Sequence, residues 1–152
     1  MTKLTVSITI KAPLEHVWNC MRKPEYIVQR GFADAETRHC PWARGEMPEV
    51  GGIFTTRMEA RDGSFGFDLS GQYSHVEPMK QVSYTMGEMK EYFLDAGRVV
   101  DVTFEEDTAA WTVKVTEVFD AEDIHDHNMQ IAGWQSILEN YKKVCEQGTP
   151  NA

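Results

Sequence analysis

Hydrophobic and polar residues alternate along most of the first 120 positions, a pattern that is typical of half-buried β-strands. The alternation begins at residues 4–10 and returns at 53–61, 65–76, 81–86, 92–105 and 110–119. Turn-forming pairs such as Asp62-Gly63 and Glu106-Asp107 separate the predicted strands. The irregular segment 29–50 could add one more strand. The pattern therefore predicts an antiparallel sheet of six to seven strands.

Helical periodicity appears only near the two ends of the chain. Two short helices are predicted after the first strand, at 13–21 and near 25–28, and one long helix at 121–147. The long helix has a largely apolar face whose members recur at steps of four and three: His127, Ile131, Trp134, Leu138, Tyr141 and Cys145. A one-sided helix after many strands predicts an α+β fold in which a curved sheet holds the helix. An apolar cavity can lie between the two.

Size and charge narrow the classes of function. Residues 1–147 are predicted to form one domain, followed by a disordered tail at 148–152. The net charge of −9 disfavours binding to nucleic acid and to anionic membrane surfaces. No apolar run approaches the roughly 20 residues that span a bilayer, and the chain enters its first strand without the apolar core of a signal peptide. We expect a cytoplasmic protein.

Residues that could carry metal or covalent chemistry are few. Cys20, Cys40 and Cys145 are widely spaced and odd in number, so we expect reduced thiols. His125 and His127 would point about 200° apart on a helix, so a metal site is disfavoured. No phosphate-binding glycine loop or dinucleotide fingerprint is present, and we expect no cofactor.

Four short segments together resemble a known family. They are ITIKAPLEHVW at 8–18, GGIF at 51–54 with Asp62-Gly63 after it, GQYSHVEP at 71–78, and GWQSIL at 133–138. On these segments the chain resembles the activator of heat-shock-protein-90 ATPase homologue-like family of the START/Bet v 1-like (SRPBCC) superfamily. The resemblance implies a helix-grip fold, a pocket for a small hydrophobic molecule, and a monomer or homodimer. Activation of the chaperone belongs to longer proteins with a further domain.

The chain departs from the family pattern near the expected mouth of the pocket. Members commonly have tryptophans after the second short helix and Arg-Pro before the double glycine, whereas this chain has QRGF at 29–32 and PEV at 48–50. Ligand preference therefore cannot be transferred from the family.

The leading hypothesis is a cavity that binds a lipid-like, polyketide or aromatic molecule between sheet and helix. Such pockets are mostly apolar, with a few polar groups that orient the ligand. The residues predicted to line it are Trp18, Phe54, Met58, Phe67, Leu69, Tyr73, Tyr84, Phe104, Trp111, His127, Ile131, Trp134, Leu138 and Tyr141. The competing interpretation is that the same side chains fill a solid core.

Two other functions remain open. A cyclase or hydrolase would need a titratable side chain inside the cavity, and His127 and Asp68 are the candidates. A chaperone-interaction module would instead present a large exposed apolar patch.

Overall fold

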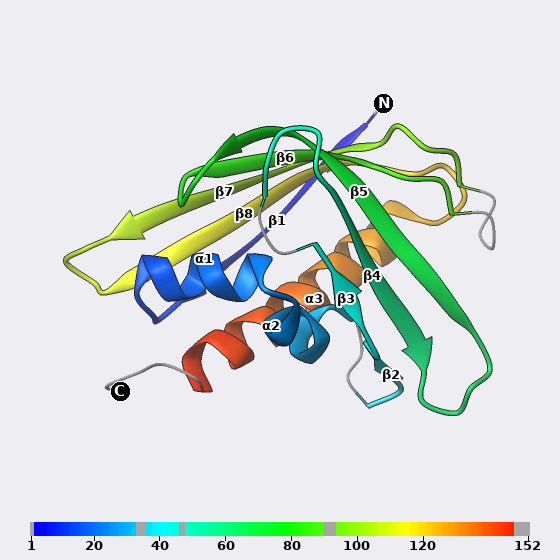
Figure 1. Ribbon diagram of the computed structural model, residues 1–152, viewed down its shortest axis with the longest axis horizontal. Coiled ribbons are helices and arrows are strands. Elements are labelled where there is room, and N and C mark those ends of the chain that lie inside the picture. The colour runs from blue at the N-terminus through cyan, green and yellow to red at the C-terminus, as the bar shows by residue number, and fades with distance from the viewer. Residues whose placement is uncertain (1, 33–35, 46–47, 90–93, 148–152) are drawn as a thin grey trace.

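One antiparallel sheet forms most of the protein and curves around the C-terminal helix (Figure 1). The computed structural model describes residues 2–32, 36–45, 48–89 and 94–147. The strand order in the described residues is β1-β8-β7-β6-β5-β4-β2, and β3 pairs with β4. The strands are β1 (Lys3–Ile10), β2 (Arg38–His39), β3 (Ala43–Arg44), β4 (Ile53–Ala60), β5 (Gly66–Glu77), β6 (Gln81–Met86), β7 (Val99–Asp107) and β8 (Thr112–Asp120). This confirms the predicted α+β helix-grip fold.

The described residues form three helices, which lie on the concave side of the sheet (Figure 1). The short helices α1 (Leu14–Arg22) and α2 (Pro24–Arg30) follow β1, as predicted, and α3 (His127–Gln147) closes the chain. Pro24 occupies the first turn of α2, where its missing N–H costs nothing. None of the helices in the described ranges is long and apolar enough to cross a membrane.

The long helix begins at His127, six residues later than predicted. The side chain of Gln130 holds the preceding segment as a loop: its Oε1 accepts the N–H of Glu122, and its Nε2 donates to the carbonyls of Glu122 and His125. These bonds satisfy backbone groups that a helix would otherwise have paired. The segment 121–126 is therefore a loop, although its composition suits the start of a helix.

Strand β7 also starts later than predicted, at Val99 instead of residue 92. Residue 92 and the predicted tail at 148–152 lie outside the described residues. Gly97 has a φ of +110°, a conformation that interrupts a strand, and the N–H of Gly97 donates to the carbonyl of Met86. The regular ladder begins just after this point.

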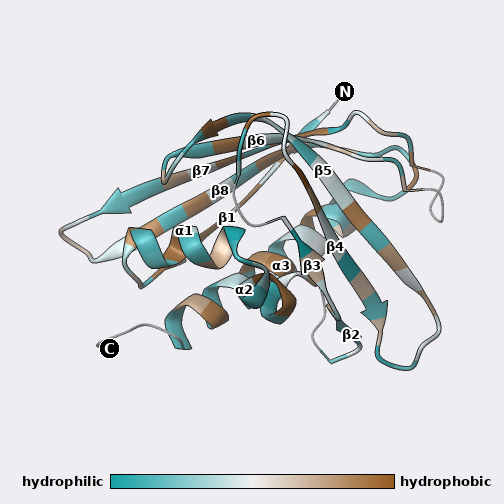
Figure 2. Cartoon of the chain, in the orientation of Figure 1, coloured by the Kyte–Doolittle hydropathy of each residue, from teal (hydrophilic) through white to brown (hydrophobic). Residues whose placement is uncertain are grey.

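The core follows the alternation of the strands (Figure 2). Val82, Val100, Val115 and Phe119 are fully buried on the concave face. Trp134 of α3 stacks flat on Phe119, with 3.9 Å between ring centroids and 4° between ring planes. This stacking fixes one face of α3 against β8.

Side chains of α3 also bind the edge of the sheet. Gln135 Nε2 donates to the carbonyl of Ser7, and Lys142 Nζ donates to the carbonyl of Thr9, both on β1. These two bonds use the exposed edge of β1 and hold the helix along that strand.

Candidate ligand-binding cavity

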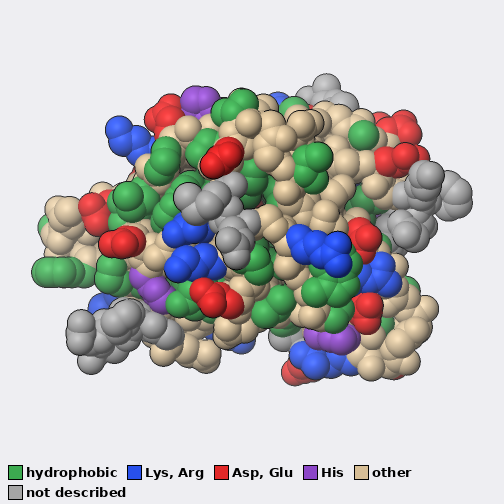
Figure 3. Space-filling view, in the orientation of Figure 1, with side chains coloured by type: hydrophobic (Ala, Val, Ile, Leu, Met, Phe, Trp, Pro, Cys, Tyr) green, Lys and Arg blue, Asp and Glu red, His purple; other side chains and the backbone are tan. Residues whose placement is uncertain are grey.

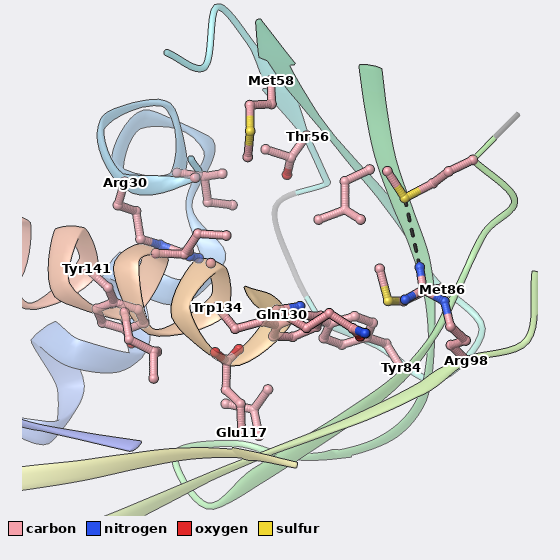
Figure 4. Close-up of a pocket in the computed structure, with 18 of the residues that line it drawn as sticks. Arg30, Thr56, Met58, Tyr84, Met86, Arg98, Glu117, Gln130, Trp134 and Tyr141 are labelled. Atoms are coloured by element: carbon pink, nitrogen blue, oxygen red, sulfur yellow. Dashed lines mark hydrogen bonds between the residues drawn. The ribbon is translucent and has the colours of Figure 1, made fainter. Parts of the chain in front are cut away.

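A cavity of about 440 Å³ lies between the concave face of the sheet and α3 (Figure 4). Small-molecule sites typically have volumes of roughly 300–1,000 Å³, so the cavity can hold a small organic ligand. Met129 and His125 line it and are exposed to solvent, Met129 by 61%. The cavity therefore opens beside the N-terminal end of α3.

The helix contributes a continuous stripe to the cavity. Its lining residues are spaced by three or four positions or are direct neighbours: Met129, Gln130, Gly133, Trp134, Ile137, Leu138 and Tyr141. Gly133 lies in the middle of this stripe, and a Cβ added there would meet no atom within 4 Å. The missing side chain leaves open space at the centre of the helix face.

Three aromatic rings from β4, β5 and β6 form the opposite wall. Phe54 meets Tyr84 edge-on at 4.9 Å and lies 5.1 Å from Tyr73, centroid to centroid. The ring of Phe54 lies over Gly71, its cross-strand partner, where a Cβ would come within 2.6 Å of the ring. Burial raises the pKa of Tyr73 to about 12 and that of Tyr84 well above its ordinary value, so both hydroxyls stay neutral.

Nine of the fourteen side chains that we predicted as lining face this cavity. They are Phe54, Met58, Phe67, Leu69, Tyr73, Tyr84, Trp134, Leu138 and Tyr141. Their contact with a ligand stays a prediction. The other five, Trp18, Phe104, Trp111, His127 and Ile131, do not line it.

For each of these five residues, the structure gives a local reason why it does not line the cavity. Trp18 and Phe104 pack edge-on against each other at 5.6 Å, in a filled part of the core. Ile131 packs against the same core, because the helix face is rotated from the one that we predicted. His127 is the exposed first residue of α3. Trp111 is 79% exposed with a φ of 58°, in the turn between β7 and β8.

The position of Trp111 follows from the length of a hairpin. We predicted the turn at residues 106–107, but the pairing of β7 with β8 continues to Asp107 and Thr112. The turn therefore occupies residues 108–111, and Trp111 lies in it instead of on the strand.

Asp68, a candidate for an acid or base, lies outside the cavity. Its carboxylate pairs with Arg57 at 3.2 Å, and its side chain is 53% exposed. Neither Asp68 nor His127 lines the cavity, so neither is placed to act on a bound molecule.

Glu117, on β8, is one of two carboxylates among the described residues that line the cavity. Its cross-strand neighbours on the concave face are Val6 on one side and Val102 on the other, both nearly fully buried. No hydrogen bond or ion pair joins Glu117 to another of the described residues. Burial raises its pKa to about 7, although the charge of Arg30 acts in the opposite direction. Figure 4 shows the carboxylate rising from β8 towards α3.

Arg30, at the end of α2, lines the cavity but is held by the protein itself. Its Nε donates to the carbonyl of Cys20 at 3.0 Å, and one Nη donates to the carbonyl of Met21 at 2.6 Å. Its guanidinium also lies over the ring of Tyr141, 4.8 Å from the centroid. Arg30 therefore joins α1, α2 and α3 and adds positive charge near Glu117.

Arg98, just before β7, lines the cavity and has hardly any partner among the residues that the structure describes. It is 8% exposed, its Nε is buried without a hydrogen bond, and one Nη lies 3.9 Å from the sulfur of Met89. Asp120 pairs instead with Lys3 at 2.6 Å. Burial lowers the pKa of Arg98, while the charges of Glu122 and Asp120 raise it. Arginine nevertheless keeps its proton in proteins, so a buried positive charge faces the cavity.

None of the charged residues that line the cavity was among the residues predicted from the sequence. The missed group comprises Arg30, Arg38, Arg98, Glu117 and Glu122. A signal was present for two of them. Glu117 alternates in phase with Val115 and Phe119, and Arg98 in phase with Val100, so each belongs to the apolar face of its strand.

One of the three cysteines contacts this charged group, since the carbonyl of Cys20 accepts a hydrogen bond from the Nε of Arg30. Cys20, Cys40 and Cys145 are buried, and none of them forms a disulfide with another described residue, which agrees with the expected reduced thiols.

Comparison with known proteins finds both a matching family and similar structures. The sequence profile of the family described as activator of Hsp90 ATPase homolog 1-like protein matches residues 11–146. A solution structure of the AHSA1-like protein from Aeromonas hydrophila is 34% identical, with a TM-score of 0.82 over 96% of this chain and 93% of that one. A solution structure from Cytophaga hutchinsonii is 33% identical, with a TM-score of 0.74 over 95% and 92%.

More distant similarity concerns the fold alone. A crystal structure of a protein from Chromobacterium violaceum has a TM-score of 0.82 at 17% identity, over 95% of this chain and 96% of that one. A comparison with curated proteins gave no match.

Proposed function

Because the chain belongs to the family of activator of Hsp90 ATPase homolog 1-like proteins, we propose that it binds a small, largely apolar molecule in the cavity beneath α3. Proteins with this fold commonly bind hydrophobic ligands. The observation that carries the proposal is the cavity itself: about 440 Å³, walled by aromatic and aliphatic side chains, with an open end.

The affinity would come mainly from burial of the ligand's apolar surface. Removing about 200 Å² of apolar surface from water contributes roughly 5 kcal/mol, before the costs of immobilising the ligand. The methionines Met58, Met86 and Met129 line the cavity and are unbranched, so they can adjust to ligands of different shape.

Gly133 offers a direct test, since its missing side chain leaves space in the lining. Gly133→Leu would fill part of the cavity, whereas Gly133→Ala would add one methyl group and serve as the matched control. Native mass spectrometry of the freshly purified protein, followed by mass analysis of released molecules, identifies any resident ligand. Titration with the neutral fluorescent probe N-phenyl-1-naphthylamine measures binding directly.

We expect the Ala variant to bind like the wild-type protein and the Leu variant to lose at least about tenfold in affinity, through lost volume and overpacking. Equal binding by a folded Leu variant would show that ligands bind elsewhere, and the proposal would fail.

An enzyme acting in the same cavity is the second candidate, and Glu117 is the observation that favours it. A carboxyl group with a pKa of about 7 can both donate and accept a proton near neutral pH. If a cyclase- or hydrolase-type reaction occurs, Glu117→Gln should bind the substrate but leave it unconverted in the mass spectrum. Conversion at the wild-type rate by the variant would exclude Glu117 as the acid or base.

A chaperone-interaction module has less support. It calls for a broad apolar surface, whereas on the face seen in Figure 3 apolar side chains are interspersed with charged ones.

A further inference from the structure

We propose that the natural ligand is an organic anion, an apolar molecule whose carboxylate or other acidic head group is bound by the guanidinium of Arg98. This inference rests on the proposed function, because it assigns the head group of the molecule that the cavity would hold. It starts from a buried charge that forms no ion pair with any of the described residues.

Arg98 is buried, yet it does not have the role of a structural arginine. Buried arginines are normally paired with a carboxylate or hydrogen-bonded to several carbonyls, as Arg30 is here. Arg98 makes no ion pair with any described residue, and the only hydrogen bond that its side chain makes there goes to the sulfur of Met89, a weak acceptor. An anion bound in the cavity would supply the missing acceptors.

The backbone holds Arg98 in a fixed position. The N–H of Met86 donates to the carbonyl of Arg98 at 2.7 Å, and the N–H of Gly97 donates to the carbonyl of Met86 at 3.0 Å. Arg98 is also in phase with Val100 and Val102, both buried on the concave face. Figure 4 shows its guanidinium directed into the cavity on the side of Met86.

Two carboxylates, Glu122 and Asp120, lie near enough for their charges to act on Arg98, but within the described residues neither forms an ion pair with it. Glu122 Oε1 is bound by the backbone N–H and the Nδ1 of His125, each at 2.8 Å. Asp120 binds Lys3 and the N–H of Val99. Asp120 therefore uses both of its oxygens elsewhere, whereas Glu122 uses Oε1 and keeps Oε2 buried without a hydrogen bond in the described residues.

Taken together, the charged residues that line the cavity favour an anionic ligand over a cationic one. Three arginines, Arg30, Arg38 and Arg98, line the cavity against two acids, Glu117 and Glu122. Glu117 lies far from Arg98: its partner on β7 is Val102, four residues along the strand, which is about 13 Å. A head group at Arg98 would thus avoid Glu117, while the apolar body of the ligand would lie between them, against Tyr84 and Trp134.

Two probes with the same aromatic body test the proposal. 1-Anilinonaphthalene-8-sulfonate carries one negative charge, and N-phenyl-1-naphthylamine lacks the sulfonate. We expect Arg98→Met to weaken binding of the sulfonate by about tenfold or more, as for loss of a charge-assisted hydrogen bond, and to change binding of the neutral probe by less than about threefold. Arg98→Lys should keep most of the affinity for the sulfonate, since it keeps the charge.

The outcomes separate this proposal from the one on which it rests. If Arg98→Met binds the sulfonate as tightly as the wild-type protein, or weakens both probes equally while folded by circular dichroism, Arg98 is not an anion site. If the wild-type protein binds neither probe, or if Gly133→Leu binds both normally, the cavity is not the binding site and the proposed function itself fails.

A competition on the wild-type protein needs no variant to fold. Decanoate and decan-1-ol are each used to displace the neutral probe at about pH 8, where the acid is ionised. Displacement by decanoate at a clearly lower concentration than by the alcohol supports the proposal. Equal displacement, or better displacement by the alcohol, overturns it.

Discussion

Replacing Glu117 with glutamine removes a titratable group from the cavity and leaves the size of the side chain almost unchanged. The pKa of Glu117 is raised from 4.5 to about 7 in the folded protein. Between these values the folded protein holds a proton that the unfolded chain has lost, so stability falls as the pH rises. The loss is complete above about pH 8, where the carboxylate is ionised in both states.

The size of the effect follows from the shift. At about 1.4 kcal/mol per pH unit, a rise from 4.5 to about 7 corresponds to roughly 3 kcal/mol. The difference in unfolding free energy, Glu117→Gln minus wild type, should therefore grow by about 3 kcal/mol between about pH 4 and about pH 9. The variant gains because it has no charge to bury.

Urea unfolding followed by tryptophan fluorescence, at about pH 4, 6 and 9, measures this difference. Glu139→Gln is the matched control, because Glu139 is exposed on α3 and the substitution removes the same charge. A constant difference between Glu117→Gln and wild type across the three pH values would refute the reasoning. It would mean that the carboxylate of Glu117 is as well hydrated in the cavity as in the unfolded chain.

Three further substitutions probe the frame of the cavity. Gly133→Ala should raise the unfolding free energy by up to about 1 kcal/mol, measured by thermal denaturation, because alanine favours the helix and its methyl group meets no atom. Gly71→Ala should lower it by about 1–3 kcal/mol in urea unfolding, since the new Cβ would push against the ring of Phe54; an unchanged midpoint would contradict the close contact. Trp111→Gly should leave the affinity for N-phenyl-1-naphthylamine unchanged and stabilise the protein by up to about 1 kcal/mol, because Trp111 is exposed at positive φ. Weaker binding of the probe would show that Trp111 contributes to the binding site.

Most of the fold was predictable because strands and helices follow local periods. The predicted strand at 81–86 agrees with β6 at both ends, and the predicted strand at 53–61 differs from β4 by one residue. Errors arose where a contact between distant residues decides the structure. The start of α3 depends on the side chain of Gln130 binding back to the preceding loop, which no local pattern reveals.

The side of α3 that faces the cavity was also difficult to predict from the sequence. A stripe of apolar residues predicts that a helix is buried on one side, but not which of its neighbours lies where. In α3, Ile131 packs in the core, while Gly133 and Ile137, about 160° and 120° away around the helix, face the cavity. The rotation of α3 is held by contacts with distant residues, such as the bonds of Gln135 and Lys142 to β1, which no local pattern contains.

For two charged residues of the cavity, the alternation of the strands was a sequence signal that they face inwards. Glu117 interrupts an otherwise apolar face that includes Val113, Val115 and Phe119, and Arg98 precedes Val100 in the same phase on the next strand. A charge inside a filled core would need a partner of opposite sign, because an unpaired buried ion is very unstable. No such partner contacts either residue within the described part of the chain. A charge on the concave face of such a sheet therefore indicates that the space above it is open. It is a better sequence marker of the cavity than the aromatic residues are, because aromatic residues pack equally well in a solid core.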